Sequence, residues 1–511
     1  MSDLWARFPE LLAAHLWLSL GALAIATAIS LPLGILAERS PAARRVVLGS
    51  VGVLQTIPSL ALLAFMVPLI GALAPAVESV IGIRPSAIGF GPALAALTLY
   101  AMLPILQNTV TGLAGVGANY LEAAKGVGMT PRQSLFMVEL PLAAPVILAG
   151  LRTAAVWTVG TAVLATPIGG SSLGDYIFVG LQTRNHAAVA VGCVGSAALA
   201  LALDGWARAL ERAVERRKRK RAAGLLVGLL AGAIALSAPS WGTGTADAKV
   251  GAKAFTEGYV MAEVARAKLE DAGLSTELLG SLGSSVAFDA LVSGDIDMNL
   301  DYSGTILSMV MKEELSGRGR QEALERVRSW LKETHDIRVA AVLGFENTYA
   351  FAIEKTRAEQ LGVQTLSELK PHAPQLDLVG SYELFDRPEW KSIQAAYHFD
   401  FAATRTMEHA LAYEALAQGE VDLLVAYSTD ARVKGYGLVL LEDDAGAIPP
   451  YDAILLVRGA FADAHPEAMK ALGTLEGAFD GAAARELNFA VDEEGRSAAA
   501  VAREWASAHA P

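Results

Sequence analysis

Four tyrosines in the second half of the chain stand where predicted strands meet loops: Tyr302, Tyr349, Tyr427 and Tyr451. The face of a tyrosine ring attracts an alkylammonium through the ring quadrupole, with about 0.5–2 kcal/mol per contact. A quaternary ammonium has no N–H to donate, so ring faces suit it better than a single carboxylate does. Ring faces at these four positions therefore suit a methylated ammonium group, whose binding requires no general base or nucleophile.

Three further residues are candidates for binding the opposite end of such a ligand. Lys253 ends the first predicted strand of this half, Thr305 follows Tyr302 by three residues, and Arg387 lies in SYELFDRPEW. An ammonium, a hydroxyl and a guanidinium can together hold one carboxylate, and arginine can do so with two hydrogen bonds. We therefore expect a small zwitterion. Choline lacks a carboxylate and fits this pattern less well.

The sequence lacks the motifs of common hydrolytic and metal-dependent enzymes. It contains no HExxH, no GxSxG and no Cys/His set with metal-ligand spacing. Its one cysteine, Cys193, cannot form an internal disulfide. We predict that the chain is not an enzyme and binds no metal or cofactor itself.

The elements around these residues are short β-rich runs that alternate with amphipathic helices from residue 249 onward. The predicted strands cover 249–255, 275–280, 298–304 and 337–345, and the predicted helices cover 257–272, 284–293 and 319–333. This alternation predicts an α/β fold with mainly parallel sheets. We expect two lobes, lobe one at 249–345 and 449–511 and lobe two at 346–448. The ligand should bind in the cleft where strands end.

The first half of the chain has a different composition. Hydrophobic residues make up 53% of the whole chain and charged residues 18%, with a mean hydropathy of +0.39. These values exclude a disordered chain or a nucleic-acid-binding chain. Residues 1–221 contain 17 Lys and Arg against 10 Asp and Glu, whereas the remainder contains 24 against 43. An apolar, basic half therefore precedes an acidic half that has the composition of a soluble domain.

Long uncharged runs in the first half predict membrane-spanning helices. A hydrocarbon core of about 30 Å requires about 20 apolar helical residues. Five segments qualify, at roughly 12–36, 47–75, 87–112, 143–167 and 187–207, and a sixth, shorter one covers 222–240. The predicted fold class is an all-α polytopic membrane domain of about six helices followed by an α/β two-lobed periplasmic-binding-protein fold. The membrane domain covers 1–210, the basic segment, sixth helix and linker 211–248, and the binding domain 249–511.

Basic residues predict how the helices are oriented in the cytoplasmic (inner) membrane. They cluster in three loops, at Arg39, Arg44 and Arg45, at Lys125 and Arg132, and in the run RAVERRKRKR at 212–221. All three loops are cytoplasmic if the N-terminus lies outside, and the second half is then extracytoplasmic. The basic run also suits contact with anionic membrane lipid. Together with 222–248 it has features of a signal peptide, so cleavage there stays open.

The loop at 120–147, YLEAAKGVGMTPRQSLFMVELPLAAPVI, predicts a helix-turn-helix with a break at Gly128, a helix start at Pro131 and a helix end at Pro141. It resembles the coupling loop of ATP-binding-cassette importer permeases, with the pattern EAA, three residues, G, nine residues, I-x-L-P. The matching residues are Glu122, Ala123, Ala124, Gly128, Leu140 and Pro141, and Val138 replaces the usual Ile. The resemblance implies a short helix that docks on an ATPase subunit. Because the chain lacks G-x-x-x-x-G-K-[ST], we expect ATP to bind a separate ATPase chain.

The second half resembles the soluble receptors of osmoprotectant importers for glycine betaine, proline betaine, carnitine and choline. The segments that carry the resemblance are GAKAFTEGY, LDYSGT, FENTYAF, SYELFDR and LVAYSTD. It implies that the four tyrosines form the ammonium cage and that Lys253, Thr305 and Arg387 contact the carboxylate. Asn347 stands where some members have Asp, whose backbone carbonyl faces the ammonium.

Taken together, these features predict a permease fused to its own receptor, working as a homodimer with a separate ATPase to import glycine betaine or proline betaine. Ergothioneine, choline, carnitine and a polar amino acid remain alternative cargoes. Ergothioneine importers have a similar fused arrangement, and their ligand also pairs a trimethylammonium with a carboxylate. A membrane-anchored chemosensory receptor is an alternative of another class, but a sensor needs no coupling loop.

Overall fold

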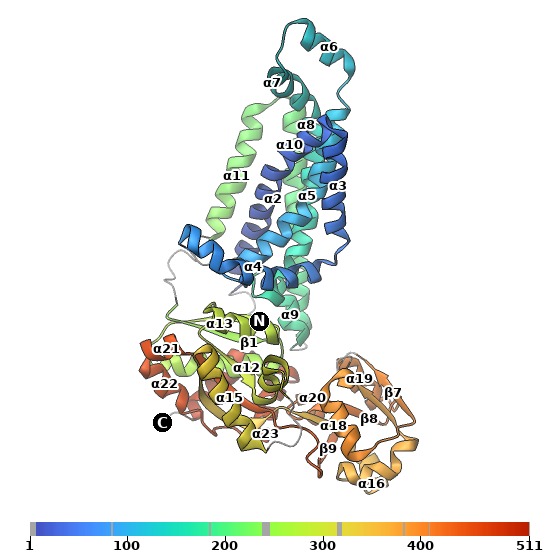
Figure 1. The fold of residues 1–511 in the computed structure, drawn as a ribbon, viewed down its shortest axis with the longest axis vertical. Helices are drawn as coiled ribbons and strands as arrows, with labels where there is room; N and C mark the ends of the chain where they lie inside the picture. Colours follow the sequence, from blue (N-terminus) through green and yellow to red (C-terminus); the bar gives the residue numbers. More distant parts are fainter. Residues whose placement is uncertain are drawn as a thin grey trace. The chain divides into compact units, whose positions relative to one another are not determined.

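The computed structural model describes residues 7–509 apart from 83–84, 183–184, 238–245, 314–318, 382–383 and 408. The chain divides into two compact units. A helical unit takes in most of residues 7–237, and an α/β unit takes in most of residues 246–509 (Figure 1). The predicted fold class is confirmed.

Ten helices of the helical unit are described: α2 Phe8–Arg39, α3 Pro41–Thr56, α4 Ser59–Ile81, α5 Phe90–Ala114, α6 Ala118–Gly126, α7 Pro131–Ser134, α8 Leu140–Ala162, α9 Gly174–Gln182, α10 His186–Glu215 and α11 Arg219–Ser237. Among the described residues, five helical stretches are long and apolar enough to cross a membrane: Phe8–Arg39, Ser59–Val80, Phe90–Ala114, Pro131–Ile168 and His186–Glu215. Buried small and aliphatic side chains from α2, α5 and α8 form the centre of the bundle.

The second predicted span differs from the structure in where it begins. Instead of one helix over 47–75, α3 ends at Thr56 and α4 begins at Ser59. Ile57 has an extended backbone, with φ −73° and ψ 128°. Pro58 explains the break, because a proline ring disfavours helical backbone in the residue before it.

The sixth predicted segment is a helix, α11, but it is not among the five long apolar stretches. Its uncharged part, 222–237, is about 24 Å long at about 1.5 Å per residue, less than the hydrocarbon core. The helix nevertheless packs into the bundle, where Ala233 is buried with side chains of α2, α8 and α10. Trp206 Nε1 of α10 also donates a hydrogen bond to Leu225 O of α11, 3.0 Å away. Residues 238–240 of the prediction lie outside the described residues.

The loop at 120–147 forms two short helices that lead into α8. Thr130 caps α7 with its hydroxyl, and Pro131 occupies the first turn, as predicted. The predicted helix end at Pro141 is wrong, because Pro141 lies in the first turn of α8, directly after a π-helical turn at Leu135–Glu139. A proline in a first turn lacks only an N–H that would have no partner there, so the helix continues.

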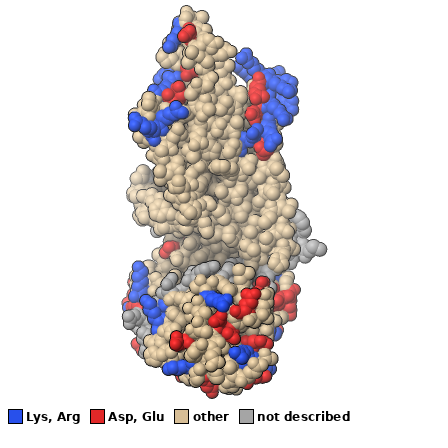
Figure 2. Space-filling view, turned by 90° about the vertical axis from the view of Figure 1, so that its right-hand side faces the viewer, with Lys and Arg blue, Asp and Glu red and all other residues tan. Residues whose placement is uncertain are grey.

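Figure 2 shows Lys and Arg gathered toward one end of the helical unit, next to a broad band without charged side chains.

The α/β unit contains two five-stranded sheets, one in each lobe. The first has the strand order β2-β1-β3-β10-β4 and the second β7-β6-β8-β5-β9. The first contains β1 Ala248–Lys253, β2 Thr276–Leu282, β3 Met298–Tyr302, β4 Ile337–Glu346 and β10 Asp452–Arg458. The second contains β5 Tyr349–Glu354, β6 Asp377–Gly380, β7 Ala403–Thr406, β8 Leu423–Tyr427 and β9 Leu438–Leu441. The chain therefore leaves the first sheet after β4 and returns to it at β10.

Helices cover both sheets of this unit. Around the first sheet lie α12 Thr256–Asp271, α13 Ser284–Ser293, α14 Ser303–Thr305, α15 Arg320–His335, α21 Gly459–Ala464, α22 Pro466–Gly473, α23 Gly481–Asp492 and α24 Ala498–Ala508. The second lobe contains α16 Lys355–Leu361, α17 Leu366–Leu369, α18 Pro388–Tyr397, α19 His409–Ala417 and α20 Ala431–Gly435. Its core packs aliphatic and aromatic side chains of β5, β6 and β8 against α18.

Both sheets are mixed, so the prediction of mainly parallel sheets is wrong. The pairs β1–β3, β6–β7 and β6–β8 are parallel. The strand β10 is antiparallel to β3 and β4, and β5 is antiparallel to β8 and β9. The reason lies in the connections, because β5 and β10 are the strands that directly follow the two crossings between lobes. Neither is preceded by the crossover helix that a parallel neighbour requires.

Candidate ligand-binding site

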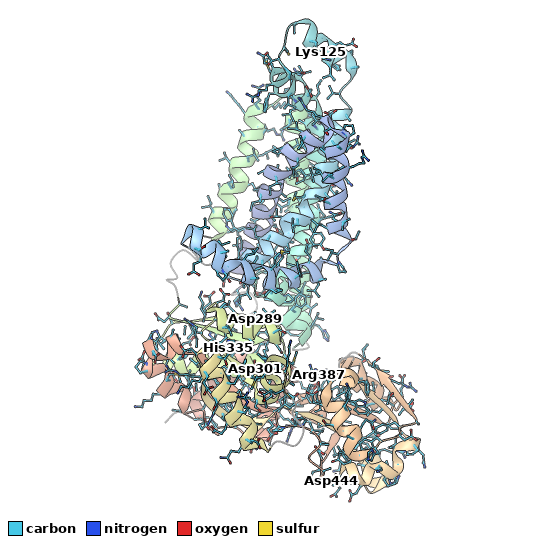
Figure 3. The ribbon with its side chains drawn as sticks, in the orientation of Figure 1. Lys125, Asp289, Asp301, His335, Arg387 and Asp444 are labelled. Carbon is cyan, nitrogen blue, oxygen red and sulfur yellow. The ribbon has the colours of Figure 1, made fainter. Side chains whose placement is uncertain are left out.

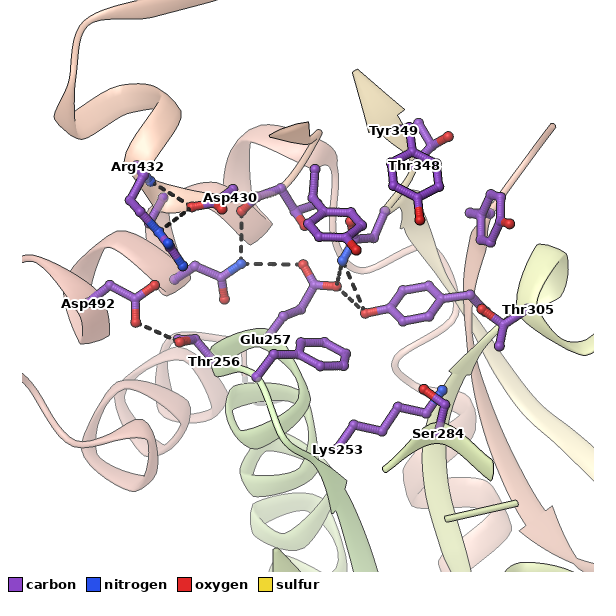
Figure 4. A pocket seen from close by; sticks show the side chains of 18 of the residues that line it. Lys253, Thr256, Glu257, Ser284, Thr305, Thr348, Tyr349, Asp430, Arg432 and Asp492 are labelled. Atoms are coloured by element: carbon purple, nitrogen blue, oxygen red, sulfur yellow. Dashed lines mark hydrogen bonds and ion pairs between the residues drawn. The ribbon is translucent and has the colours of Figure 1, made fainter. Parts of the chain in front are cut away.

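One pocket of about 440 Å³ is lined by residues of both lobes. It brings together all eight ligand-binding residues predicted from the sequence. They are Lys253, Tyr302, Thr305, Asn347, Tyr349, Arg387, Tyr427 and Tyr451. Figure 3 marks Arg387 and Asp301, which belong to different lobes of this unit, and Figure 4 shows the pocket from close by.

Antiparallel register explains why the tyrosines converge in pairs. Tyr349 begins β5 and Tyr427 ends β8, and the two residues are direct cross-strand partners. Their rings stack with centroids 5.3 Å apart. In the other lobe Tyr302 ends β3 opposite Ala453 of β10, which places it beside Tyr451. A residue that ends one antiparallel strand meets the residue that begins its neighbour, so distant tyrosines come together at two sheet edges.

Gly304 makes room for the Tyr451 ring. A Cβ atom at this glycine would lie 2.8 Å from three atoms of that ring, closer than carbon atoms approach. Thr305, the next residue, lies at the end of the short helix α14 and lines the pocket. The sequence Tyr-Ser-Gly-Thr therefore supplies one of the four tyrosine rings of the pocket, the space for a second ring and a hydroxyl.

Lys253 forms a buried ion pair. Its Nζ lies 2.6 Å from Asp301 Oδ1, and the two side chains are 2% and 1% exposed. The pairing follows from the parallel register of β1 and β3, in which Gly251 is opposite Asn299. The same Nζ lies 5.5 Å from the centroid of the Tyr302 ring. The charge of Lys253 is thus already compensated within the protein, although the residue lines the pocket.

Arg387 and Asn347 both line the pocket, and Arg387 is the N-cap residue of α18 in lobe two. The guanidinium carbon of Arg387 lies 5.9 Å from the centroid of the Tyr349 ring. Asn347 follows β4 in the first crossing segment, and its backbone N–H donates to Tyr451 O in the second crossing segment, 3.1 Å away. This hydrogen bond ties the two crossings together.

Glu257 is a pocket residue that sequence reasoning missed. It lies in the first turn of α12 and is 2% exposed. Its carboxylate accepts hydrogen bonds from the Tyr302 hydroxyl, from Asn347 Nδ2 at 3.1 Å and from Asn488 Nδ2 at 3.3 Å (Figure 4). Burial raises the pKa of Glu257, and these hydrogen bonds act in the opposite direction. The Glu257 carboxylate thus connects Tyr302, the first crossing segment and α23 through hydrogen bonds.

A second group of missed residues lines the far side of the pocket. Burial raises the pKa of Asp492 to about 7, although Thr256 Oγ1 donates a hydrogen bond to it at 2.6 Å. Asp430 caps α20 and pairs with Arg432, whose Nε lies 3.2 Å from Oδ1. Glu257 and Asp430 lie within the segments GAKAFTEGY and LVAYSTD. Their place in these segments was the sequence signal that could have identified them as pocket residues. Asp492 lies in none of the segments singled out from the sequence.

The structure also places the predicted coupling-loop residues. Glu122 and Ala123 are exposed on α6, whereas Ala124 is buried. Gly128 has φ +78°, with nothing within 4 Å of a Cβ built at that position. Leu140 and Pro141 begin α8. Exposed apolar side chains surround these residues, among them Tyr120, Val127, Phe136 and Met137.

No group of three or more potential metal ligands occurs among His, Cys, Asp and Glu of the described residues. The pocket contains hydrogen-bonding groups, cations, carboxylates and ring faces. In chemical terms this arrangement can bind and orient a small charged molecule.

Two families match the chain. Residues 246–508 match the substrate-binding domain of the ABC-type glycine betaine transport system, OpuAC. Residues 30–216 match the binding-protein-dependent transport system inner membrane component. The two matches correspond to the α/β unit and the helical unit.

Three relatives show the same division. The ergothioneine transport permease/ergothioneine binding protein EgtU of Helicobacter pylori (strain G27) is 29% identical over 489 residues, covering 93% of this chain and 85% of that protein. The choline transport system permease protein OpuBB of Bacillus subtilis (strain 168) is 43% identical over 190 residues, covering 37% of this chain and 80% of that protein. The carnitine transport binding protein OpuCC of Listeria monocytogenes is 29% identical over 275 residues, covering 53% of this chain and 89% of that protein.

Proposed function

Because the chain belongs to the osmoprotectant-type ABC importer family, with a permease fused to an OpuAC substrate-binding domain, we propose that it imports a quaternary-ammonium zwitterion such as glycine betaine or proline betaine. The observation that carries this proposal is the convergence of Tyr302, Tyr349, Tyr427 and Tyr451 on one pocket. The four phenol rings hold the ammonium by cation–π attraction.

The ring faces of the pocket already lie next to cations of the protein. Lys253 Nζ is 5.5 Å from the centroid of Tyr302, and the Arg387 guanidinium carbon is 5.9 Å from that of Tyr349. Both distances are within the range of about 6 Å over which ring faces attract cations. A ligand ammonium is a cation of the same kind, without N–H groups that would need acceptors.

Arg387 and Thr305 bind the ligand carboxylate in this proposal. Arginine can hold a carboxylate through two parallel hydrogen bonds, and a threonine hydroxyl can donate a third. Lys253 contributes less than its charge suggests, because Asp301 already pairs with it. Its proposed role is to fix this side of the pocket and to donate one further N–H.

Ergothioneine is the second candidate ligand. The Helicobacter pylori relative named for ergothioneine covers 93% of this chain and has the same fused arrangement. A cavity of about 440 Å³ is within the usual range for small-molecule sites and accommodates more than the eight heavy atoms of glycine betaine. Ergothioneine carries the same trimethylammonium and carboxylate, with a ring in addition.

The membrane half needs a separate ATPase, since importer permeases of this family work with one. The exposed residues around Glu122 and Gly128 are the proposed contact with that ATPase, in a complex that contains two copies of this chain. The helix α11, packed beside α2 and α10, serves as the sixth crossing. With six crossings, the α/β unit lies on the extracytoplasmic side in this proposal, where it captures the solute.

Calorimetry on the full chain in lipid nanodiscs tests the ligand class. Glycine, sarcosine, dimethylglycine and glycine betaine form a series with the same charges and rising methylation, and proline betaine, carnitine, choline and ergothioneine complete the panel. We expect affinity to rise along the series and to be greatest for a fully methylated zwitterion. Binding only to glycine or another primary amine would contradict the proposal, and so would the absence of binding to the whole panel.

A further inference from the structure

Two of the four cage tyrosines direct their hydroxyls onto buried carboxylates. The Tyr302 hydroxyl donates to Glu257, and the Tyr451 hydroxyl donates to Glu389 of α18. Glu257 belongs to lobe one and Glu389 to lobe two. Two neighbouring rings are therefore each held at the hydroxyl by a glutamate, and the two glutamates come from different lobes.

Neither glutamate has a cationic partner among the described residues. Glu389 is 1% exposed, and its Oε2 is buried without a hydrogen-bond partner in the described part of the chain. The other groups bonded to Glu257 are the neutral amides of Asn347 and Asn488 and the neutral side chain of Thr429. The buried Lys253–Asp301 pair shows the contrasting arrangement, in which a carboxylate next to the same cage has its own cation.

A buried carboxylate without a counter-charge is costly, because it loses its hydration and gains no opposite charge. A hydrogen bond from a tyrosine hydroxyl offsets part of this cost and draws the O–H proton toward the carboxylate. The phenol oxygen then becomes more negative, and so does the ring to which it is attached. A cation over the face of that ring experiences both the enriched ring and the charge behind it.

We propose that Glu257 and Glu389 are positioning residues that orient the Tyr302 and Tyr451 rings and supply the counter-charge for the ligand ammonium. This inference rests on the proposed function. In this inference, Glu257 and Glu389 let the site distinguish a positive head group from a neutral group of the same shape. Neither residue belongs to the four-tyrosine cage. The bound ammonium in turn compensates the two buried carboxylates.

A pair of isosteric ligands separates this role from a merely structural one. The compound 3,3-dimethylbutanoate has the shape and carboxylate of glycine betaine, with a neutral tert-butyl group in place of trimethylammonium. Affinities of both ligands are measured on the full chain in nanodiscs, by calorimetry and by displacement of radiolabelled glycine betaine. Glu389→Gln and Glu257→Gln each remove one charge while keeping a side chain of similar size.

We expect each variant to bind glycine betaine about tenfold more weakly, while the affinity for 3,3-dimethylbutanoate changes less than about threefold. Glu263→Gln is the matched control, because Glu263 lies in the same helix as Glu257, pairs with Arg266 and does not line the pocket. It should leave both affinities unchanged. Glu389→Asp keeps the charge and should retain the preference for the ammonium, even where the shorter side chain weakens binding of both ligands.

Equal losses for the two ligands in both glutamine variants would assign a purely structural role to the glutamates and overturn the inference. Unchanged betaine affinity would overturn it as well. If Glu389→Gln unfolds the unit, as judged by thermal melting, Glu257→Gln and Glu389→Asp decide the question independently. If the unsubstituted chain binds no quaternary ammonium at all, the proposed function itself fails, which is a different result.

Discussion

At the scale of single residues, each of the four tyrosine rings of the proposed cage has a different environment. Tyr427 is the least enclosed of the four, since the other three are each 5% exposed. It stacks on Tyr349, whereas Glu257 and Glu389 accept hydrogen bonds from Tyr302 and Tyr451. Its ring therefore reports on cation–π binding with little contribution from the buried carboxylates.

Tyr427→Ala removes one ring face from the cage. We expect glycine betaine binding to weaken by about 1–2 kcal/mol, which is about five- to thirtyfold, because one cation–π contact is lost. Tyr427→Phe keeps the ring and should stay within about threefold of the unsubstituted chain. Calorimetry on the full chain provides both numbers, and equal affinities for all three proteins would remove Tyr427 from the cage.

Asp492 predicts a pH dependence of stability. Burial raises its pKa to about 7 in the folded chain, whereas an unfolded chain has a value near 3.9. The neutral carboxyl is therefore favoured in the fold, and its contribution to stability is lost as the pH rises from about 4 through about 7. Above that pH the ionised, half-buried carboxylate destabilises the α/β unit.

Asp492→Asn removes this penalty and can still accept the hydrogen bond from Thr256. We expect the variant to be more stable than the unsubstituted chain at pH 8, by up to about 4 kcal/mol, with a smaller gain at pH 5. Thermal and denaturant unfolding without ligand measure this difference. Asp463→Asn is the control, since Asp463 is exposed and paired with Arg338. A gain in stability that is equal at pH 5 and pH 8 would contradict the predicted direction of the pH dependence.

Much of the site could be predicted from residue types and spacing, and the reason is physical. The tyrosines, Thr305 and Arg387 lie in short segments beside strand ends, and strand ends converge in α/β folds. Lys253 was predicted as a carboxylate contact, but its partner Asp301 depends on register between strands 48 residues apart. Glu257, Glu389 and Asp492 become visible only through burial, because an acidic residue in a sequence is most often exposed.

At the scale of elements, the proposed coupling loop contains a backbone conformation that only glycine adopts easily. Gly128 has φ +78° between α6 and α7, and a side chain there would meet no neighbour. A substitution therefore acts through backbone strain, not through a clash. The predicted break at Gly128 and the start at Pro131 came from local residue preferences, whereas the continuation past Pro141 depends on the π-helical turn before it.

Gly128→Ala should lower ATP-driven uptake in proteoliposomes by about fivefold, because a left-handed backbone costs a residue with a Cβ about 1 kcal/mol. Solute binding to the same protein should not change. Gly126→Ala is the matched control, because Gly126 ends α6 without a positive φ and also has open space around it. Equal uptake by the two variants would show that this backbone conformation does not contribute to coupling.

At the scale of the whole molecule, the helical unit and the α/β unit together provide a pathway and a receptor in one chain. Covalent linkage raises the local concentration of the receptor near the permease. The proposed orientation requires α11 to cross the membrane, since five crossings would leave both the basic run and the α/β unit on one side. The residue pattern did not predict the mixed sheets. Their antiparallel strands result from the way in which the chain crosses twice between the lobes.

Cysteine labelling tests this orientation. In a Cys193→Ser background, Glu359→Cys places a thiol on the exposed surface of α16, and Lys125→Cys places one on the coupling loop (Figure 3). A membrane-impermeant maleimide should label the first in spheroplasts and the second only after lysis. The opposite pattern would put the α/β unit in the cytoplasm, and labelling of both sites before lysis would indicate leaky cells.

The most direct test of the central claim is a structure of the full chain determined with glycine betaine or ergothioneine bound. We predict that the ammonium nitrogen lies within about 6 Å of the ring centroids of Tyr302, Tyr349, Tyr427 and Tyr451, with the carboxylate on Arg387. An ammonium placed away from these four rings, or a ligand held outside the pocket between the lobes, would contradict the account.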